Sequence, residues 1–310
     1  MRQQHRSAKT STLTVAPRPS ARRPKPAMEL DVNPLLLYLD QKDISFLAKG
    51  KTDRATADEL RHMVAAGEIA VVMSFAHIVE TALAPERLGA QIANVVDTTL
   101  KPRHWLYDFD ELSRAEVAFC LETDIGASPE PVRPFHGNPM TRGLLVGPEM
   151  TFGQAVGLAR ANRAHGASSF WNSLQQYPRL RERGRAQCDN DPIQTTNIQK
   201  FIYDSMPTQT RAGRTLSDEC RSDYAAKLDV DRCPAISLWM TVLEVKSHNK
   251  RAPIGRSEGP DLLHATAVPY CDITTLDAQM YSVVSLHRTA RCFSDRIARN
   301  VGEAVARLKG

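Results

Sequence analysis

Long apolar runs are missing from this 310-residue chain. The longest, such as 35–39 and 69–73, fall far short of the roughly 20 residues that a membrane-spanning helix needs. With 42% apolar residues, the chain can still bury a sizeable core. We therefore expect a soluble globular protein with no membrane partner.

Cysteine pairs in a C-x-x-C pattern are also missing. The sequence contains six scattered cysteines: Cys120, Cys188, Cys220, Cys233, Cys271 and Cys292. This spacing argues against a zinc knuckle and against a disulfide framework. We expect a reducing, intracellular setting and a cytoplasmic location.

Acidic residues are absent from the first 27 positions, which contain seven basic residues. The remaining 33 basic and 35 acidic residues leave the rest of the chain near neutral, so the net charge of +5 comes from this tail. The tail is rich in Ser, Thr, Pro and Arg, and we expect it to be disordered. Three interpretations remain open: an arm that contacts nucleic acid, a targeting peptide, or an extension upstream of a true start at Met28.

From Met28 onward the apolar pattern becomes regular. Continuous apolar runs at 35–40 and 69–74 are typical of strands buried on both faces. Each is followed by helical periodicity, at 56–66 before Gly67 and from 75 to about 96 with a break at Pro85. Strand, helix, strand, helix predicts a parallel sheet with crossover helices.

The middle of the chain, about 112–249, predicts a largely helical insertion within a domain spanning 28–310. Ser113 and Glu116 have the spacing of a capping box, and helices are expected over 152–180 and 234–246. After the insertion we expect a helix from about Asp261 and a last strand at 273–276. The closing helix should have one apolar face, formed by Phe293, Ile297, Val301, Val305 and Leu308.

Four acids are predicted to meet at one edge of the sheet. Asp40 and Asp277 close the first and last predicted strands, Glu80 lies early in the helix after the second strand, and Asp261 begins a helix. The carboxyl ends of parallel strands share one edge, where ligands bind. Taken singly, each acid is better explained as a turn acceptor, a solvated side chain or a first-turn helix acid. The set of four favours a shared site.

Clustered carboxylates repel one another, and a hard divalent cation relieves that repulsion. Mg²⁺ or Mn²⁺ prefers oxygen ligands and is commonly held by carboxylates together with water and phosphate oxygens. Such an ion promotes phosphodiester hydrolysis by activating a water molecule and neutralising phosphate charge. The acids therefore predict a metal-dependent nuclease with Mg²⁺ or Mn²⁺ as its cofactor.

Three stretches resemble the PIN domain nucleases, specifically a longer bacterial PIN-like branch. They are YLDQKDISFLA, the S-x-x-H-x-x-E pattern at Ser74, His77 and Glu80, and the D-x-x-H-A pattern at Asp261 followed by PYCDITTLD. The resemblance covers 28 to about 100 and 258–310. It matches the four family acids to Asp40, Glu80, Asp261 and Asp277.

The resemblance implies an α/β fold, a three-layer α/β/α sandwich with a central parallel sheet. It also implies hydrolysis of RNA at a site that binds one or two divalent ions. Many PIN domains have Asn or Thr two residues after the first acid, where this chain has Lys42. The chain is also longer than the toxin ribonucleases, so a toxin and antitoxin pair is not assumed.

Five further residues are candidates for supporting roles at the site, each with a structural alternative. Lys42 could approach a substrate phosphate, His77 and His264 could bind an acid or a phosphate or be structural core histidines, and Ser74 could orient a carboxylate or cap a helix. Asp272 is either a turn acid or an outer partner of the site. The chain also has an arginine cluster formed by Arg179, Arg181, Arg183 and Arg185, which could bind substrate or form a solvated face.

Three functions compete. The first is the nuclease, with RNA as its expected substrate. The second is a catalytically inactive PIN-like binding protein whose helical middle contacts a partner. The third is a phosphatase, but an Asp-x-Asp pair is missing at the first strand, where Gln41 and Lys42 follow Asp40. A homo-oligomer is possible, and the sequence identifies no protein partner.

Overall fold

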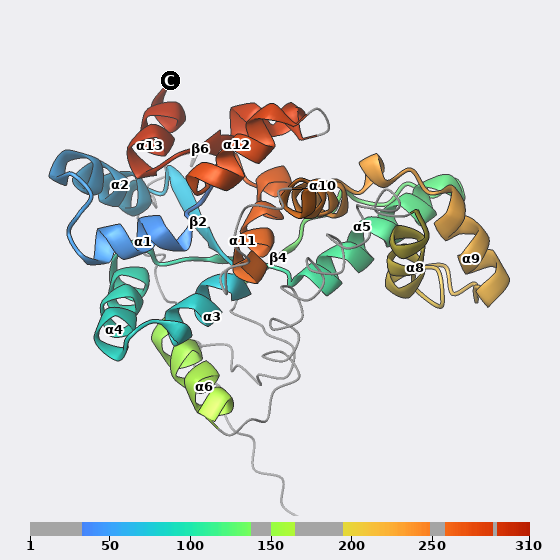
Figure 1. The fold of residues 1–310 in the computed structure, drawn as a ribbon, viewed down its shortest axis with the longest axis horizontal. Coiled ribbons are helices and arrows are strands. Elements are labelled where there is room, and N and C mark those ends of the chain that lie inside the picture. Colours follow the sequence, from blue (N-terminus) through green and yellow to red (C-terminus); the bar gives the residue numbers. More distant parts are fainter. Residues whose placement is uncertain (1–32, 138–149, 165–194, 249–257, 288–289) are drawn as a thin grey trace, which may run out of the picture. The chain divides into compact units, whose positions relative to one another are not determined.

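The computed structural model describes residues 33–137, 150–164, 195–248, 258–287 and 290–310 (Figure 1). The predicted disordered tail and the arginine cluster lie outside these residues. All elements below belong to the second of the chain's two units, Pro34–Gly310. None of its described helices combines the length and the apolar character needed to cross a membrane.

A six-stranded sheet runs through this unit in the order β4-β3-β2-β1-β5-β6. The strands are β1 (Leu35–Tyr38), β2 (Ile69–Met73), β3 (His104–Leu106), β4 (Phe135–His136), β5 (Ile273–Thr275) and β6 (Ile297–Ala298). All neighbouring pairs are parallel except β3 and β4, which are antiparallel. A mostly parallel sheet is thus confirmed, whereas the antiparallel pair and the strands β3, β4 and β6 were not predicted from the sequence.

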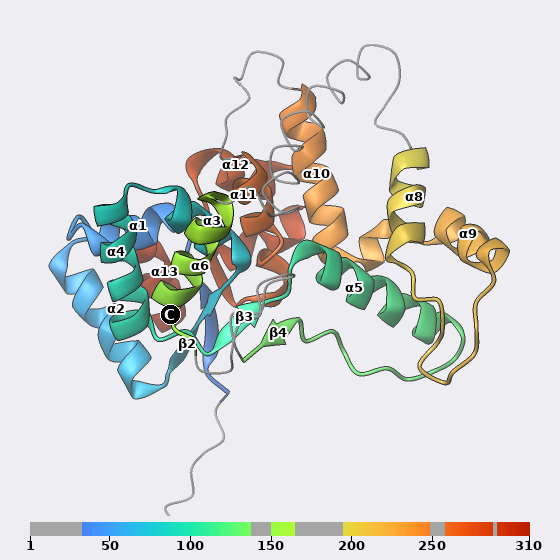
Figure 2. The same cartoon turned by 90° about the horizontal axis from the view of Figure 1, so that it is seen from below.

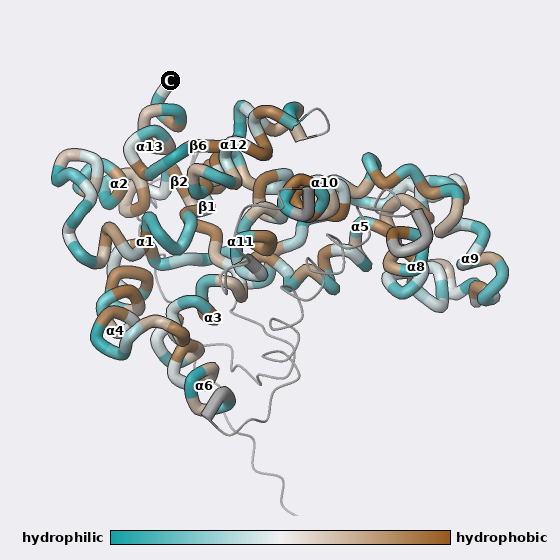
Figure 3. Tube along the Cα trace, in the orientation of Figure 1, coloured by the Kyte–Doolittle hydropathy of each residue, from teal (hydrophilic) through white to brown (hydrophobic). Residues whose placement is uncertain are grey.

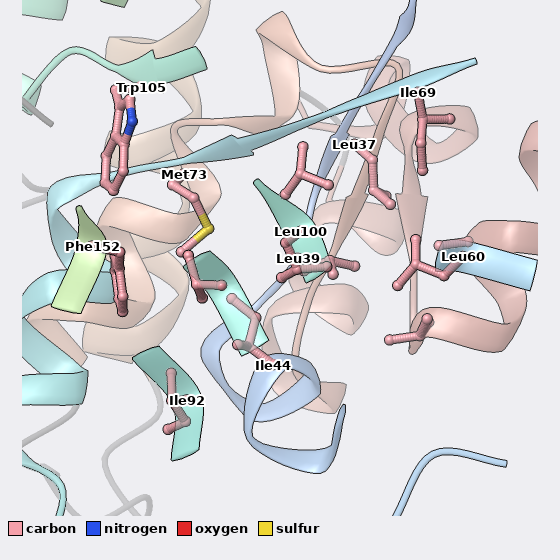
Figure 4. Close-up of a cluster of buried hydrophobic side chains, with 14 of the residues drawn as sticks. Leu37, Leu39, Ile44, Leu60, Ile69, Met73, Ile92, Leu100, Trp105 and Phe152 are labelled. Carbon is pink, nitrogen blue, oxygen red and sulfur yellow. The ribbon is translucent and has the colours of Figure 1, made fainter. Parts of the chain in front are cut away.

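Alternate side chains of the central strands enter different apolar clusters, as expected for a strand buried on both faces. Leu37 and Met73 join a large cluster, whereas Tyr38 and Val72 join a smaller one with Ala267. Figure 4 shows the large cluster, in which side chains from the sheet meet side chains from several helices. Both faces of the sheet are therefore covered.

Helices from the start, the middle and the end of the unit cover the first face (Figure 1). They are α1 (Gln41–Ala48), α2 (Arg54–Ala66), α3 (Phe75–Leu83), α4 (Glu86–Val95), which continues as a π-helical turn at Val96–Leu100, α6 (Phe152–Ala164) and α13 (Val301–Lys309). Gly67 ends α2 in a left-handed conformation, with φ of 74°, as the sequence predicts for a glycine after a helix. Along helices such as α4 the hydropathy changes repeatedly between brown and teal in Figure 3, which is typical of one buried side.

Three helices form a second apolar cluster with the loop after β5 and with β6. They are α10 (Pro234–His248), α11 (Glu258–Ala265) and α12 (Ala278–Leu286). Short 3-10 helices lie at Val268–Tyr270 and Arg291–Arg296. The structure is thus a mostly parallel sheet with helices on both faces, compatible with an α/β sandwich.

The predicted insertion is mainly helical, but it does not form a separate body. It contains α5 (Phe109–Asp124), α8 (Thr195–Ser205), α9 (Asp218–Lys227) and a 3-10 helix at Val230–Arg232, which form their own apolar cluster together with the start of α10 (Figure 2). However, β4 pairs with the sheet and α6 belongs to the large cluster. The middle of the chain therefore completes the core.

Two local predictions were wrong. The closing helix starts at Val301, because Ile297 lies in β6 and Phe293 in a 3-10 helix. The predicted capping box is also absent: α5 is capped by Asp108, and the hydroxyl of Ser113 donates to the Phe109 carbonyl within that helix. Glu116 instead caps another helix, α10, as described below.

The junction of α3, α4 and α6 depends on Arg160. Its guanidinium donates to the carbonyls of Thr81, Ala82 and Ala84 at the end of α3, at 3.1–3.3 Å. A Cβ added at Gly89 in α4 would collide with this guanidinium. The absence of a side chain at Gly89 therefore lets three helices meet around one arginine.

We expect Gly89→Ala to lower the free energy of unfolding by about 1–2 kcal/mol, because the arginine must move away from its acceptors. Chemical denaturation measures the change. In an Arg160→Met background the same substitution should cost less, since the colliding group is gone. An equal cost in both backgrounds would contradict the assigned cause.

Candidate functional site

The four predicted acids are delivered by four different elements. Asp40 follows β1 and begins α1, and Glu80 lies in α3, after β2. Asp261 lies in the first half of α11. Asp277 follows β5 and caps α12, where its side chain accepts a hydrogen bond from the backbone N–H of Met280 at 2.7 Å. β1, β2 and β5 are adjacent parallel strands, so their carboxyl ends point to one edge.

The carboxylates are close enough to affect one another's charge. Burial raises the pKa of Asp40, and Glu80 and Asp277 raise it further against the opposing effect of His264. Burial also raises the pKa of Asp261, to about 6; Lys246 opposes this shift and Asp277 adds to it. The structure thus brings the four acids into one electrostatic group, the acid cluster.

His264 is a buried cation within the acid cluster. Its Nε2 lies 2.6 Å from Glu80 Oε2 and 3.8 Å from Asp40 Oδ1. Burial lowers the pKa of its imidazole, but Glu80, Asp40 and Asp261 outweigh that effect and raise it to about 9. The ring is therefore protonated at neutral pH and donates a charge-assisted hydrogen bond to Glu80.

Lys246 is a second buried cation, from the far end of α10. Its side chain is only 2% exposed, and its Nζ lies 3.4 Å from Asp261 Oδ2. The middle of the chain therefore contributes a side chain to the acid cluster. The sequence placed Lys246 in a helix shortly before Asp261, where basic residues could line a path to the site, but it did not predict this ion pair.

A buried network of hydrogen bonds holds His264 in place beside the acid cluster. The hydroxyl of Tyr38 lies 2.7 Å from both Ser74 Oγ and His264 Nδ1. Because the imidazolium of His264 donates from Nδ1, the tyrosine accepts there and donates to Ser74. The network fixes the ring of His264, and with it the hydrogen bond to Glu80.

His77 has a structural role in this network. Its Nδ1 accepts from the backbone N–H of Ser74 at 3.0 Å, so Nε2 carries the proton and donates to the carbonyl of Leu39 at 2.7 Å. Burial and the charge of His264 lower its pKa to about 3, which keeps the ring neutral. Ser74 and His77 thus tie the start of α3 to the end of β1, next to Asp40.

Sequence reasoning missed Asp43 and Thr275. The Thr275 hydroxyl accepts from the backbone N–H of Asp40 at 2.7 Å and also hydrogen-bonds the carboxyl of Asp43. Burial raises the pKa of Asp43 to about 6, and Asp40 contributes to the shift. The available signal was the i, i+3 spacing of two acids at the start of one helix.

Asp272 does not join the acid cluster. It precedes β5, at the opposite end of the strand from Asp277, and its carboxylate accepts from the backbone N–H of Leu36 at 2.7 Å. The role of outer partner is therefore wrong, and the turn interpretation agrees with this contact. Lys42 is exposed, with its ammonium 5.7 Å from the centre of the Phe46 ring.

The acid cluster has more negative than positive charge. Its four predicted carboxylates face two buried cations, His264 and Lys246, which leaves a formal charge of −2 before Asp43 is counted. Among the described residues, no three His, Cys, Asp or Glu side chains are close enough together to hold a metal ion between them. A hard cation such as Mg²⁺ is commonly held by only one or two carboxylates, with water and phosphate oxygens completing its shell, so the donor set fits that type of ion.

Comparison with family models, curated proteins and solved structures finds no match for this chain.

Proposed function

We propose that the protein is a metal-dependent nuclease that hydrolyses phosphodiester bonds, with RNA as its substrate. The observation that carries this proposal is the acid cluster at the carboxyl-terminal edge of adjacent parallel strands. Its four carboxylates face only two cations, so its formal charge is −2. A partly buried charge imbalance of that size is unfavourable unless a cation neutralises it. The resemblance of the three motifs to PIN domain nucleases, which rests on the same four acids, points to the same chemistry.

Asp40 and Asp277 are the best candidates to hold a divalent ion directly. They interact electrostatically with each other, and neither is the closest partner of a buried cation. Glu80 and Asp261 already face His264 and Lys246 and would act through water molecules. When bound, the ion would lower the pKa of a water molecule and neutralise charge on the phosphate.

The surrounding residues keep these acids in place. The Thr275 hydroxyl accepts a hydrogen bond from the backbone N–H of Asp40. The Tyr38 hydroxyl fixes the ring of His264. The Nε2–H of His264 in turn donates to Glu80 and fixes its carboxylate. Such preorganisation matters because a displacement of about 1 Å can cost a hundredfold in rate. His264 would keep its proton through neutral pH and favour the approach of an anionic phosphate.

Asp40→Asn tests the proposal directly. We expect it to reduce cleavage of single-stranded RNA by at least a hundredfold in Mg²⁺ or Mn²⁺, because a proposed ligand loses its charge. Its melting temperature without divalent ions should stay the same or rise, since repulsion is relieved. Asp58→Asn is the matched control because Asp58 is an exposed helix acid outside the cluster; it should cleave like the unmodified protein.

Binding of the ion is measured separately from cleavage. Mn²⁺ at about 100 times its dissociation constant should raise the melting temperature of the unmodified protein by about 5 °C, and this rise should be lost in Asp40→Asn. Stabilisation by Mn²⁺ without cleavage of RNA would favour the inactive PIN-like binding protein instead. If Mn²⁺ does not stabilise the protein and RNA is not cleaved, both the metal site and the nuclease are refuted.

A further inference from the structure

We propose that Cys120 and Cys233 form a redox-sensitive pair that closes reversibly to a disulfide. Cys120 lies in α5, and Cys233 immediately precedes α10. Their sulfur atoms are 3.7 Å apart although the residues are 113 positions apart in the sequence. This proposal does not depend on the nuclease, because neither thiol belongs to the acid cluster.

The pair needs only a small movement to bond. A disulfide has sulfur atoms about 2.05 Å apart, so the two sulfurs must approach by about 1.7 Å. We expect rotation of the two side chains to supply much of this distance. Both residues already pack in the same apolar cluster as α8 and α9, which holds the two backbones beside each other.

The two thiols have different reactivities, which suits a nucleophile and a resolving partner. The hydrogen bond with Cys233 lowers the pKa of Cys120, and the positive charge of Arg232 lowers it further. The same hydrogen bond and burial raise the pKa of Cys233. Cys120 is therefore the thiol that is more readily ionised and that attacks an oxidant first.

A partly exposed ion pair between Arg232 and Asp124 lies close in sequence to the two cysteines. Arg232 neighbours Cys233 in the chain, Asp124 lies one turn after Cys120, and the two form a bidentate ion pair at 2.8 and 2.9 Å. Their side chains are 38% and 36% exposed. Both thiols are buried, at 1% exposure, so we expect oxidation to be slower than at the exposed Cys220 and Cys292.

The reaction balances with a hydroperoxide as oxidant. The Cys120 thiolate attacks one peroxide oxygen, the O–O bond breaks, and the sulfur becomes a sulfenic acid; with hydrogen peroxide, the hydroxide that leaves takes up the proton lost by the Cys120 thiol and becomes water. The Cys233 sulfur then attacks the sulfenic sulfur, the S–OH bond breaks, and a second water leaves. Two thiols and one hydrogen peroxide thus give one disulfide and two waters, and a dithiol reductant reverses the change.

The disulfide would tie α5 to the start of α10. It would close a loop that contains α6, α8 and α9, and covalent closure of so long a loop stabilises mainly by restricting the unfolded chain. We expect the melting temperature of the full chain to rise by about 5 °C after oxidation and to return to its original value after reduction. The Cys220→Ser/Cys292→Ser double variant should show the same rise, because only exposed thiols are removed.

Peptide mapping of the full chain treated with hydrogen peroxide tests the proposal without any variant. We expect a cross-linked peptide pair containing Cys120 and Cys233 under non-reducing conditions, which separates after reduction. Cys233→Ser should abolish both the cross-link and the rise in melting temperature, and Cys120→Ser should do the same. The proposal is overturned if both thiols remain free to alkylation in the unfolded protein after the exposed cysteines have been oxidised, or if other cysteines form the cross-link.

Discussion

Lys246→Met is expected to lower the free energy of unfolding by about 3 kcal/mol when divalent ions are absent. The substitution keeps most of the buried side-chain volume but removes the charge that faces Asp261. Breaking a buried ion pair by removal of one partner typically costs 3–5 kcal/mol, and the partial exposure of Asp261 places this case at the lower end. Urea denaturation with excess chelator measures the loss.

Two further variants separate the pair from general effects of losing a lysine. Adding Asp261→Asn to Lys246→Met should restore most of the stability, because the carboxylate left behind is neutralised. Lys200→Met removes a lysine from an exposed i, i+4 pair with Asp204, and it should change stability by less than about 0.5 kcal/mol. If the double variant is no more stable than Lys246→Met alone, the ion pair does not explain the loss.

Mn²⁺ should stabilise Lys246→Met more than the unmodified protein. The variant has one more uncompensated negative charge in the acid cluster, so a divalent cation neutralises a larger imbalance. An equal gain would show that Lys246 and the ion act independently.

Glu116→Ala is expected to destabilise the fold by about 3 kcal/mol. The carboxylate of Glu116, in α5, accepts from the backbone N–H groups of Ala235 and Ile236 at 2.7 and 3.2 Å, and it also accepts from the Tyr270 hydroxyl. Truncation leaves these buried donors without their acceptor, at about 1–3 kcal/mol each before relaxation. Thermal or urea unfolding measures the loss, and Glu219→Ala, at an exposed helix position, is the control.

The same carboxyl group gives a pH dependence with a defined sign. Burial raises the pKa of Glu116 to about 7, against hydrogen bonds that lower it. The folded state therefore holds a proton that the unfolded chain releases near pH 4.5. This contribution to stability is fully present below about pH 4.5 and is lost as the pH rises through about 7.

Glu116→Gln tests this dependence because it is neutral at every pH and keeps one acceptor. We expect it to flatten the curve of unfolding free energy between pH 5 and 8 relative to the unmodified protein. A curve of unchanged slope would show that other groups govern the dependence.

The central strands could be predicted from the sequence because they are buried on both faces and so appear as unbroken apolar runs. β3, β4 and β6 contain only two or three residues each, which leaves little pattern to read, whereas β5, also of three residues, was predicted as part of a run at 273–276 that ends before Asp277. Ile297 was assigned to the closing helix because it lies four residues before Val301. In the structure Ile297 lies in β6, which pairs with β5. Over a single turn, the spacing of apolar residues does not distinguish this strand from a continuation of the helix.

The acids of the candidate site could be predicted because the carboxyl ends of adjacent parallel strands lie at one edge of the sheet, whatever the paths of the connecting loops. One of their counter-ions, His264, was among the predicted supporting residues because it lies one turn after Asp261, but the ion pair of Lys246 with Asp261 was not predicted. Lys246 reaches Asp261 through the packing of α10 on α11, and Glu116 caps a helix more than a hundred residues later in the chain. Both contacts are tertiary, whereas spacing rules describe neighbours along one element.

The outermost strands of the described sheet, β4 and β6, are two residues long. A strand that ends a sheet presents unpaired backbone groups to any extended chain that approaches, and a longer margin binds such a chain more tightly. Margins of two residues offer room for only one or two ladder hydrogen bonds. Strand addition at these two described edges is therefore disfavoured.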